Sequence, residues 1–467
     1  MLSSSSPRID LDGDLEKNES QVPSIKSTTD EDIQRYTADA LCISNRYDAS
    51  GDMPEHIAVA SVKALGPPPD GGLLAWTQVA MAHLVVLNTW GTINSFGIFQ
   101  TYYTSALSRP PSDISWIGSI QVFLLFFIGT LTGRLTDAGY FRYVFMIGSL
   151  LVVFGSLMAS LSTTYEQLFL SQGVCIGLGM GCLFCPIVAV LCTFFVKKRN
   201  LAIGLSISGS ATGGVIFPLM VRQLLPQIGF SWTMRCIALV QFVSMLIANI
   251  FVRTRIQPRK TGPLVEWSAF KEGPYGFFVL GSFFAKNFWG VYIAFYYIGA
   301  FSRDILGYSY HDSINLLVLM NGIGAIGRIL PGLIADRWCG PLHVIIPASF
   351  ICMVLLYSWN SIHSHTGIYG LAVIYGIFGA TVQGIFPAAL SSMTLDISKS
   401  GMRMGMAFSI VAFANLSGPP IAGALIRKAD GRYLYAFVFA GTCLCLGTIF
   451  SIICRIVKGG FVLRAKI

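Results

Sequence analysis

The sequence predicts an all-α membrane protein with twelve transmembrane helices, arranged as two pseudo-symmetric halves of six helices each. Composition, recurring apolar windows and an internal repeat support this prediction. Of the 467 residues, 54% are hydrophobic and 12% are charged, and the mean hydropathy is +0.64. A soluble protein carries about twice that share of charged residues, so the composition argues against a water-soluble enzyme.

Apolar windows long enough to cross a bilayer recur along the chain. A spanning helix needs about 20 predominantly apolar residues. The expected spans lie near residues 74–102, 113–133, 143–162, 168–193, 201–223, 232–252, 274–300, 311–333, 342–360, 367–391, 403–426 and 433–455.

The first 66 residues differ from the rest of the chain. They are rich in Ser, Thr, Asp and Asn, and 12 acidic against 6 basic residues give them a net charge of −6. Such a segment cannot bury enough apolar surface to fold alone. The expected organisation is a disordered cytoplasmic tail (1–66), an N-terminal six-helix half (67–253), a cytoplasmic linker (254–273), a C-terminal six-helix half (274–455) and a cytoplasmic tail (456–467).

The basic residues indicate the orientation in the membrane. The whole chain has a net charge of +9, but residues 67–467 hold 26 basic and 11 acidic residues. With a cytoplasmic N-terminus, 17 of the basic residues fall in inner loops and the C-terminal tail, and 6 in outer loops. Positive residues accumulate on the cytoplasmic side, so we expect both termini there. The plasma membrane is the expected location, with the vacuolar or another internal membrane as the alternative.

The two halves share residues at a nearly constant spacing. The pairs Pro186/Pro387, Gly204/Gly405 and Pro218/Pro419 are each 201 residues apart, and the segments 133–137 and 332–336 are 199 apart. Several matches in the same order, on either side of a basic linker, indicate a duplication of six helices. Parallel repeats of this kind place a substrate cavity near the middle of the membrane, between the halves.

Three motifs resemble those of a known family. They are Asp70-Gly-Gly-Leu-Leu-Ala-Trp76 at the first helix, Phe195-Val-Lys-Lys-Arg-Asn-Leu-Ala-Ile-Gly204 with Gly213-Gly214 at the fifth, and Gly401-Met-Arg-Met-Gly-Met-Ala-Phe408 with Gly418-Pro-Pro-Ile-Ala-Gly423 at the eleventh. In this order they resemble the monocarboxylate-transporter-like family (monocarboxylate porters) of the major facilitator superfamily, especially its fungal branch. The resemblance covers about residues 67–455 and implies that superfamily's fold and transport by alternating access.

Two positions depart from the family pattern. Well-studied animal members carry a lysine in helix 1 that couples protons to substrate, and the corresponding position here is Asn94. They also carry an aspartate one turn before a functional arginine in helix 8. Here the arginine is Arg328 and the residue four earlier is Gly324. The resemblance therefore implies a functional arginine without implying proton–monocarboxylate symport.

Two cations are expected inside the spans, Lys286 in the seventh and Arg328 in the eighth. All 11 acidic residues after position 66 fall in loops or at helix ends. A lone cation at the centre of a span costs about 2.5–3.5 kcal/mol and usually faces a cavity, and Arg grips a carboxylate with two parallel hydrogen bonds. We therefore predict that both cations bind an anionic substrate group. The alternatives are snorkelling or pairing with a loop acid for Arg328, and contact with backbone carbonyls or Trp289 for Lys286.

Four neutral polar residues are predicted to bind substrate in the same cavity, namely Asn94, His83, Asn321 and Gln383. His83 and Asn94 share a face of the first helix, and Asn321 shares a face of the eighth with Arg328. His83 also has the chemistry to take up a proton near neutral pH. The alternative for each is packing or helix–helix hydrogen bonding.

A second set of charged residues is predicted to act in gating or in structural motifs, namely Asp70, Arg134, Asp137, Arg199, Asp336 and Arg337. Two Arg/Asp pairs of this set occupy equivalent cytoplasmic turns of the two halves. The resemblance implies latches between the halves there, in which charge pairs stabilise one access state. The alternative is ordinary solvated loop charge.

These features predict a secondary-active transporter that moves a small organic anion or related metabolite by alternating access. The alternatives are an exporter of a secondary metabolite or drug-like compound, and a nutrient sensor that does not transport. No catalytic residue, metal site or cofactor is expected, and the chain has no Walker-type nucleotide loop. The expected partners are an anionic or amphipathic small molecule and the lipid bilayer, not nucleic acid. The sequence decides neither proton coupling, nor direction, nor oligomeric state.

Overall fold

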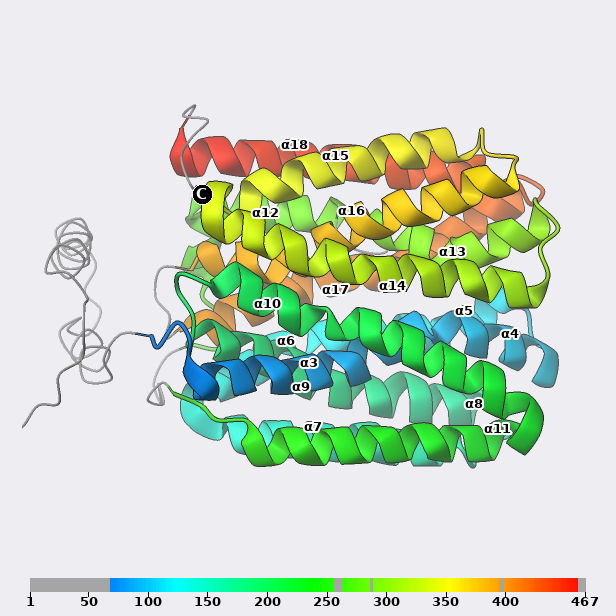
Figure 1. Cartoon of the computed structure of the whole chain (residues 1–467), viewed down its shortest axis with the longest axis horizontal. Helices are drawn as coiled ribbons and strands as arrows, with labels where there is room; N and C mark the ends of the chain where they lie inside the picture. The colour runs from blue at the N-terminus through cyan, green and yellow to red at the C-terminus, as the bar shows by residue number, and fades with distance from the viewer. Residues whose placement is uncertain (1–67, 256–262, 286–288, 395–398, 461–467) are drawn as a thin grey trace, which may run out of the picture. The chain divides into compact units, whose positions relative to one another are not determined.

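The computed structural model describes residues 68–255, 263–285, 289–394 and 399–460, which form helices and no strand (Figure 1). The predicted all-α fold is confirmed. The first series of elements is α3 (Gly72–Asn94), α4 (Phe96–Ala106), α5 (Pro111–Phe127), α6 (Gly129–Leu135), η1 (Thr136–Tyr140), α7 (Phe141–Ala159), α8 (Tyr165–Leu168), η2 (Phe169–Cys175), α9 (Ile176–Cys192), α10 (Arg199–Ile207) and α11 (Gly209–Phe251). The second series is η3 (Trp267–Lys271), α12 (Gly273–Ala285), α13 (Val291–Asp304), α14 (Tyr310–Ile334), η4 (Ala335–Cys339), α15 (Pro341–Trp359), α16 (His365–Ser392), α17 (Ser400–Lys428) and α18 (Leu434–Gly459).

Nine segments of the described residues are long and apolar enough to cross a bilayer, by length and composition. Two of them are long enough to cross twice: Asp113–Ala159 has 47 residues and Arg199–Phe251 has 53, whereas one crossing needs about 20. Each contains a glycine at which the helical backbone breaks, Gly139 with φ 92° and Gly229 with φ 76°. Figure 1 shows α11 turning back on itself. Eleven of the twelve expected windows therefore fall on described spans.

Several expectations concern residues outside the described ranges. The remaining expected window, the seventh at 274–300, contains α12 and α13 on either side of residues 286–288, so the predicted substrate residue Lys286 is not described. The predicted tail of residues 1–66 and parts of the linker and of the C-terminal tail also lie outside. These expectations stay predictions.

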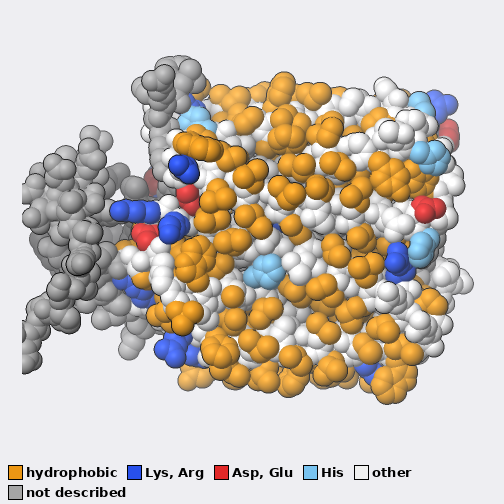
Figure 2. Space-filling model, viewed as in Figure 1, with side chains coloured by type: hydrophobic (Ala, Val, Ile, Leu, Met, Phe, Trp, Pro, Cys, Tyr) orange, Lys and Arg blue, Asp and Glu red, His pale blue; other side chains and the backbone are white. Residues whose placement is uncertain are grey.

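The outer surface of the bundle is apolar along most of its length. On α7, Tyr143, Leu150 and Phe154 are 64%, 60% and 54% exposed, whereas Val152 and Ala159 on its inner face are fully buried. Figure 2 shows this surface, with most of the charged side chains of the visible face at its two ends. Apolar surface on this scale is unfavourable in water but suits the hydrocarbon core of a bilayer.

The helices of each series pack on one another and on the other series. In the first series (the N-terminal half) α11 packs on α3 and α7 on α9, and in the second (the C-terminal half) α14 packs on α16 and α12 on α18. Between the halves, α17 lies against α5 and α6, and α10 and α11 lie against α14. Helix α3 begins and α18 ends at the same end of the bundle (left in Figure 1), which we call the terminal end. The opposite end is the far end.

Glycines allow the two halves to approach backbone to backbone. A Cβ atom on Gly405 of α17 would overlap the carbonyl oxygen of Gly129 in α6. A Cβ atom on Gly204 of α10, the repeat partner of Gly405, would overlap the carbonyl oxygen of Arg328 in α14. The repeat therefore places small residues at both contacts between the halves, as close helix packing in membranes requires.

Ion pairs join the described end of the linker to the start of α17. Arg403 is 6% exposed and donates to Glu266 from Nε (3.0 Å) and to Glu272 from Nη2 (2.6 Å) and Nη1 (2.9 Å). Lys399 adds a bond of 2.9 Å to Glu266. Although burial raises the pKa of Glu266, the bonds from Arg403 and Lys399 outweigh it and hold this pKa below its usual value. The linker is thus tied to α17 by ionised carboxylates.

We expect Gly405→Ala to destabilise the bundle, since the new methyl group meets backbone that cannot move alone. Overpacking of this kind costs about 1–3 kcal/mol, so thermal unfolding of the detergent-solubilised protein should begin at lower temperature. Gly370→Ala in α16 is the matched control, because a Cβ there meets nothing within 4 Å. An equal decrease in unfolding temperature in both variants would contradict the close contact at Gly405.

We expect the linker ion pairs to weaken in acid. Because the pKa of Glu266 is lowered in the folded protein, its stabilising contribution is present above the unfolded value of about 4.3. The contribution is lost as the pH falls from there through the lower folded pKa. As the pH falls through this acidic range, the unfolding temperature should decrease less for Glu266→Gln than for the native chain. Glu166→Gln is the control, because the 3.5 Å pair that Glu166 forms with Arg109 is exposed. If the unfolding temperature of Glu266→Gln depends on pH as that of the native chain does, Glu266 does not supply this acid-sensitive stability.

Candidate functional site

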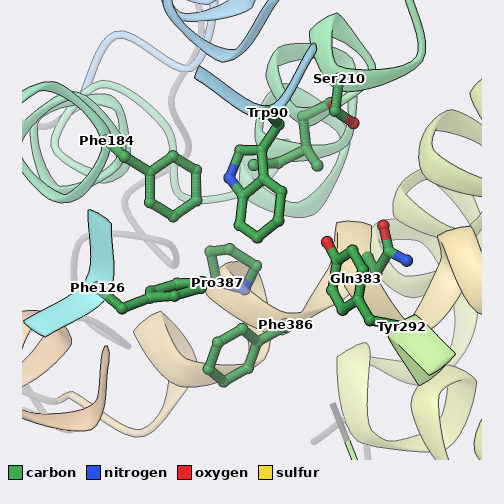
Figure 3. Close-up of a pocket in the computed structure, with 9 residues that line it drawn as sticks. Trp90, Phe126, Phe184, Ser210, Tyr292, Gln383, Phe386 and Pro387 are labelled. Atoms are coloured by element: carbon green, nitrogen blue, oxygen red, sulfur yellow. The ribbon is translucent and has the colours of Figure 1, made fainter. Parts of the chain in front are cut away.

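A small cavity lies between the two halves. Its lining comes from both, with Trp90, Phe126, Phe184, Ile207 and Ser210 from the N-terminal half and Tyr292, Gln383, Phe386 and Pro387 from the C-terminal half (Figure 3). The cavity volume is about 30 Å³, which is room for one or two water molecules. An organic substrate does not fit, so this is a closed conformation.

Aromatic rings close the cavity. Trp90 of α3 stacks on Tyr292 of α13 with ring centroids 5.4 Å apart and an angle of 18° between the planes. Phe126 and Phe184 meet Trp90 edge-on at 5.5 Å and 5.8 Å. The Trp90–Tyr292 contact joins the two halves, so it has to break when either half moves away. The sequence did not predict these rings as site residues; the signal for Trp90 is its place one turn before Asn94, on the same helix face.

Arg328 is buried behind the cavity wall. Its side chain is 1% exposed, and its Nη2 donates to Oε1 of Gln383 at 3.1 Å. Arg328 Nε and Nη1 and Gln383 Nε2 are buried and have no hydrogen-bond partner among the described residues. Unpaired donors are costly in such surroundings, and most so on an ion. The described residues around Arg328 and Gln383 therefore supply fewer hydrogen-bond acceptors than these side chains have donors.

Glycines make the space for the Arg328 side chain. A Cβ atom on Gly324 would lie 2.6 Å from Nη1 of Arg328, and one on Gly384 would lie 3.2 Å from its Cγ. The departure from the family pattern at Gly324 thus has a physical consequence. The guanidinium occupies the space over this glycine, where an aspartate would bring both bulk and a carboxylate.

Asn94 and Asn321 meet across the halves. Nδ2 of Asn94 in α3 donates to Oδ1 of Asn321 in α14 at 3.2 Å and to the carbonyl of Ser210 at 3.3 Å. Ser210 itself lines the cavity. Two of the predicted polar residues therefore form an interface contact next to the cavity, and their role toward a substrate stays a prediction.

His83 lies apart from the cavity lining. Its Nδ1 is 3.0 Å from the carbonyl oxygen of Leu205, and its Nε2 is 3.2 Å from Oγ1 of Thr212. Both partners belong to the N-terminal half, as His83 does. In this conformation His83 joins α3 to α10 and α11, and a substrate role for it stays a prediction.

Asp336 in η4 binds the start of a helix in the other half. Its Oδ1 accepts from the backbone N–H (3.1 Å) and the side-chain amide (2.8 Å) of Asn200, and its Oδ2 accepts from the N–H of Leu201 (2.7 Å). Both residues lie in the first turn of α10, where backbone N–H groups lack a helical partner. Helix N-termini also favour negative charge.

Asp137 in η1 makes the corresponding contacts in the other direction. Its carboxylate accepts from the N–H groups of Gly401 (3.1 Å) and Met402 (2.8 Å), in the first turn of α17. The sequence predicted charge pairs at these two turns. The structure shows carboxylates bonded to backbone N–H groups of the opposite half, so we call Asp137 and Asp336 the carboxylate caps.

Two other predicted motif residues also lie at the terminal end. Oδ1 of Asp70 accepts from the N–H groups of Val196 (2.6 Å) and Lys197 (2.8 Å), which joins the first motif to the second within the N-terminal half. Nη1 of Arg199 donates to Oγ of Ser391 in α16 at 3.2 Å, across the halves. The Arg199–Ser391 contact therefore adds to the closure of the terminal end, whereas the Asp70 contacts stabilise the N-terminal half alone.

The remaining two predicted gating residues are arginines. Arg134 lies in the last turn of α6, and the guanidinium of Arg337 lies over the ring of Trp338 at 5.6 Å. Their part in gating stays a prediction.

Polar contacts also close the bundle toward the far end. The Tyr296 hydroxyl donates to Oε1 of Gln100 at 2.7 Å and is 3.1 Å from Oγ of Ser115. Arg222 of α11 donates to Asn315 of α14 at 3.1 Å. The sequence predicted none of these, because single polar residues near helix ends carry no distinguishing pattern. With both ends in contact, the cavity is occluded.

Apolar spans, an occluded cavity between two halves and hydrogen-bonded contacts on either side of it define a multi-pass membrane transporter. The Major Facilitator Superfamily model matches residues 81–396. The chain belongs to the Major Facilitator Superfamily.

Named relatives agree with this membership. An MFS-type transporter of Gibberella zeae is 46% identical over 438 residues, covering 92% of this chain and 98% of the relative. The aspyridones efflux protein apdF of Emericella nidulans is 34% identical over 388 residues, covering 82% and 78%. Among solved structures, the human organic anion transporter MFSD10 (TETRAN) matches with a TM-score of 0.61 at 14% identity over 85% of this chain and 100% of that one. FucP in the outward conformation also gives 0.61, at 17% identity over 81% and 98%. At these identities the structures show the fold alone.

We expect loss of the carboxylate caps to open the terminal end. Removing a side-chain cap costs about 1–2 kcal/mol, which raises an open population roughly 5- to 30-fold. Alkylation of Cys192 reports this opening, because Cys192 is buried beside Arg199 and Ser391 between the halves. In a chain with Cys192 as its single cysteine, Asp336→Ala should speed alkylation by that factor.

Asp312→Ala is the control for this experiment. Asp312 lies in the first turn of α14 at the far end, and its carboxylate accepts from Oγ of the neighbouring Ser309 at 2.6 Å. Equal alkylation rates in the Asp336→Ala and Asp312→Ala variants would show that the caps do not hold the halves together.

Proposed function

We propose that this protein is a secondary-active exporter of an amphipathic organic acid, a metabolite with one anionic group and a sizeable apolar part. The observation that carries the proposal is the buried Arg328 behind an aromatic cavity, whose Nε and Nη1 have no hydrogen-bond partner among the residues that the structure describes. An anionic group supplies both the charge and the acceptors that the described surroundings lack, and charge-assisted hydrogen bonds are about twice as strong as neutral ones.

The cavity walls favour a substrate with an apolar part. Aromatic rings from both halves surround the central space, and Gln383 and Ser210 add polar groups to the lining. Ligand sites with mostly apolar walls and a few fixed polar groups bind molecules of the same mixed character. A relative named for aspyridone efflux supports export of such a metabolite.

A second candidate is a small monocarboxylate, as the resemblance to the monocarboxylate-transporter-like family implies. The observation in its favour is the position of Arg328 in helix 8, where that family has its functional arginine. A short acid would use the same guanidinium and leave the aromatic walls largely uncovered. Comparing short and aromatic acids in one transport assay separates the two candidates.

We propose that transport occurs by alternating access, and closure at both ends of the cavity supports this mechanism. The carboxylate caps and Arg199 hold the terminal end, and Tyr296 and Arg222 hold the far end. Opening one set while the other stays closed exposes the cavity to one side at a time. The positive-inside rule assigns the terminal end to the cytoplasm, and we propose the plasma membrane as the location because export ends there.

We expect Arg328→Gln to abolish most transport. Hydrogen bonds to charged groups contribute about 1.5–3 kcal/mol, so counterflow of a labelled substrate acid in proteoliposomes should fall roughly 10- to 100-fold. The variant should unfold at the same or a higher temperature, since it removes an incompletely paired buried ion. Repeating the assay with and without a proton gradient shows whether protons are coupled.

Arg235→Gln is the matched control, because the Arg235 guanidinium lies over the ring of Trp232 at 4.7 Å and away from the cavity lining. Unchanged transport in Arg328→Gln would overturn the proposed anion site. Acid binding without any counterflow in the native protein would favour the sensor alternative.

A further inference from the structure

The stacked pair of Trp90 and Tyr292 has the geometry of a closed slot. Both rings are buried, with 6% and 7% of their surface exposed, and their planes are nearly parallel at 18°. One ring belongs to α3 and the other to α13, so the pair spans the interface between the halves. When the halves separate, two parallel aromatic faces lose their partners together.

The slot is held in shape by further rings. Phe126 and Phe184 contact Trp90 edge-on, with interplanar angles of 61° and 72°, an arrangement that aromatic quadrupoles favour. Tyr292 also contacts Phe295 at 6.0 Å. Each ring of the slot is therefore also contacted by rings of its own half.

Among the described residues, the polar groups beside the slot include hydrogen-bond donors that have no acceptor. Gln383 lines the cavity near Tyr292 (Figure 3), and its Oε1 is taken by Arg328. Its Nε2 and the Nε and Nη1 of Arg328 remain unpaired among the described residues. A ligand that fits here brings oxygen acceptors at one edge of a flat apolar body.

We propose that the substrate is a flat, conjugated organic acid whose ring system inserts between Trp90 and Tyr292. Its ionised oxygens accept hydrogen bonds from Gln383 and Arg328. This inference rests on the proposed function and narrows its substrate class. A planar ring restores both aromatic contacts at once, whereas a saturated ring of the same size is puckered and contacts each face at few points.

The test compares three probes on the purified full chain: 2-naphthoate, its saturated counterpart decahydro-2-naphthoate, and the neutral 2-naphthamide. Binding is measured by calorimetry, and transport by counterflow in proteoliposomes. The native protein should bind 2-naphthoate about tenfold more tightly than the saturated acid, since two aromatic faces each contribute. Equal binding of the two acids, or no binding of either, would overturn the slot.

Variants assign the two preferences separately. Trp90→Leu should remove the preference for the flat acid over the saturated acid and keep the preference for acid over amide, and Trp90→Phe should retain part of the flat preference. Arg328→Gln should remove the preference for acid over amide and keep the preference for the flat acid over the saturated acid. Trp232→Leu changes an exposed tryptophan (59%) and should change neither.

The outcomes distinguish the two claims. If Trp90→Leu folds with native thermal stability and leaves the flat preference intact, the slot is wrong while the anion site stands. If Arg328→Gln leaves the acid preference intact, the proposed function is wrong. Should Trp90→Leu fail to fold, Trp90→Phe and Tyr292→Leu decide the matter, because an unchanged flat preference in both equally refutes the slot.

Discussion

Arg328 carries a positive charge into the middle of an apolar bundle, where an unpaired ion costs several kcal/mol. A hydrogen bond to Gln383 offsets part of this cost, and Gly324 and Gly384 leave space for the side chain. Two of its donor groups stay without a partner in the described residues. An anionic group of another molecule would complete these hydrogen bonds, and the proposed function rests on this one side chain.

The exclusion of carboxylates from the spans also determines how the halves meet. Acids confined to the turns bind helix N-termini of the opposite half, as Asp137 does for α17 and Asp336 for α10. Glycines such as Gly405 and Gly204 bring the same helices into backbone contact. Because the repeat supplies each contact twice, the two sides of the interface close in the same way, while the aromatic stack lies between them.

Some of the site could be predicted from the sequence and some could not. Arg328 and Gln383 are recognisable because charged and amide groups are rare within apolar spans, and the structure bonds them together. Tyr292 is not, because aromatic residues fill helix interfaces throughout such a chain. The signal for Trp90 is its place one turn before Asn94 on the same helix face. His83 is recognisable as a lone histidine in a span; in this structure its ring is hydrogen-bonded within its own half, and its role toward a substrate stays a prediction.

By itself the sequence determined the helical membrane fold, the repeat and the residue types that meet at the interface, since apolar run length and the spacing of glycine, proline and aspartate are local properties. The tertiary structure decided which donors remain unpaired, that the caps bind backbone of the opposite half, and that a tryptophan and a tyrosine from different halves lie face to face. Those facts depend on contacts between residues 55 to 265 positions apart, for which no local pattern exists.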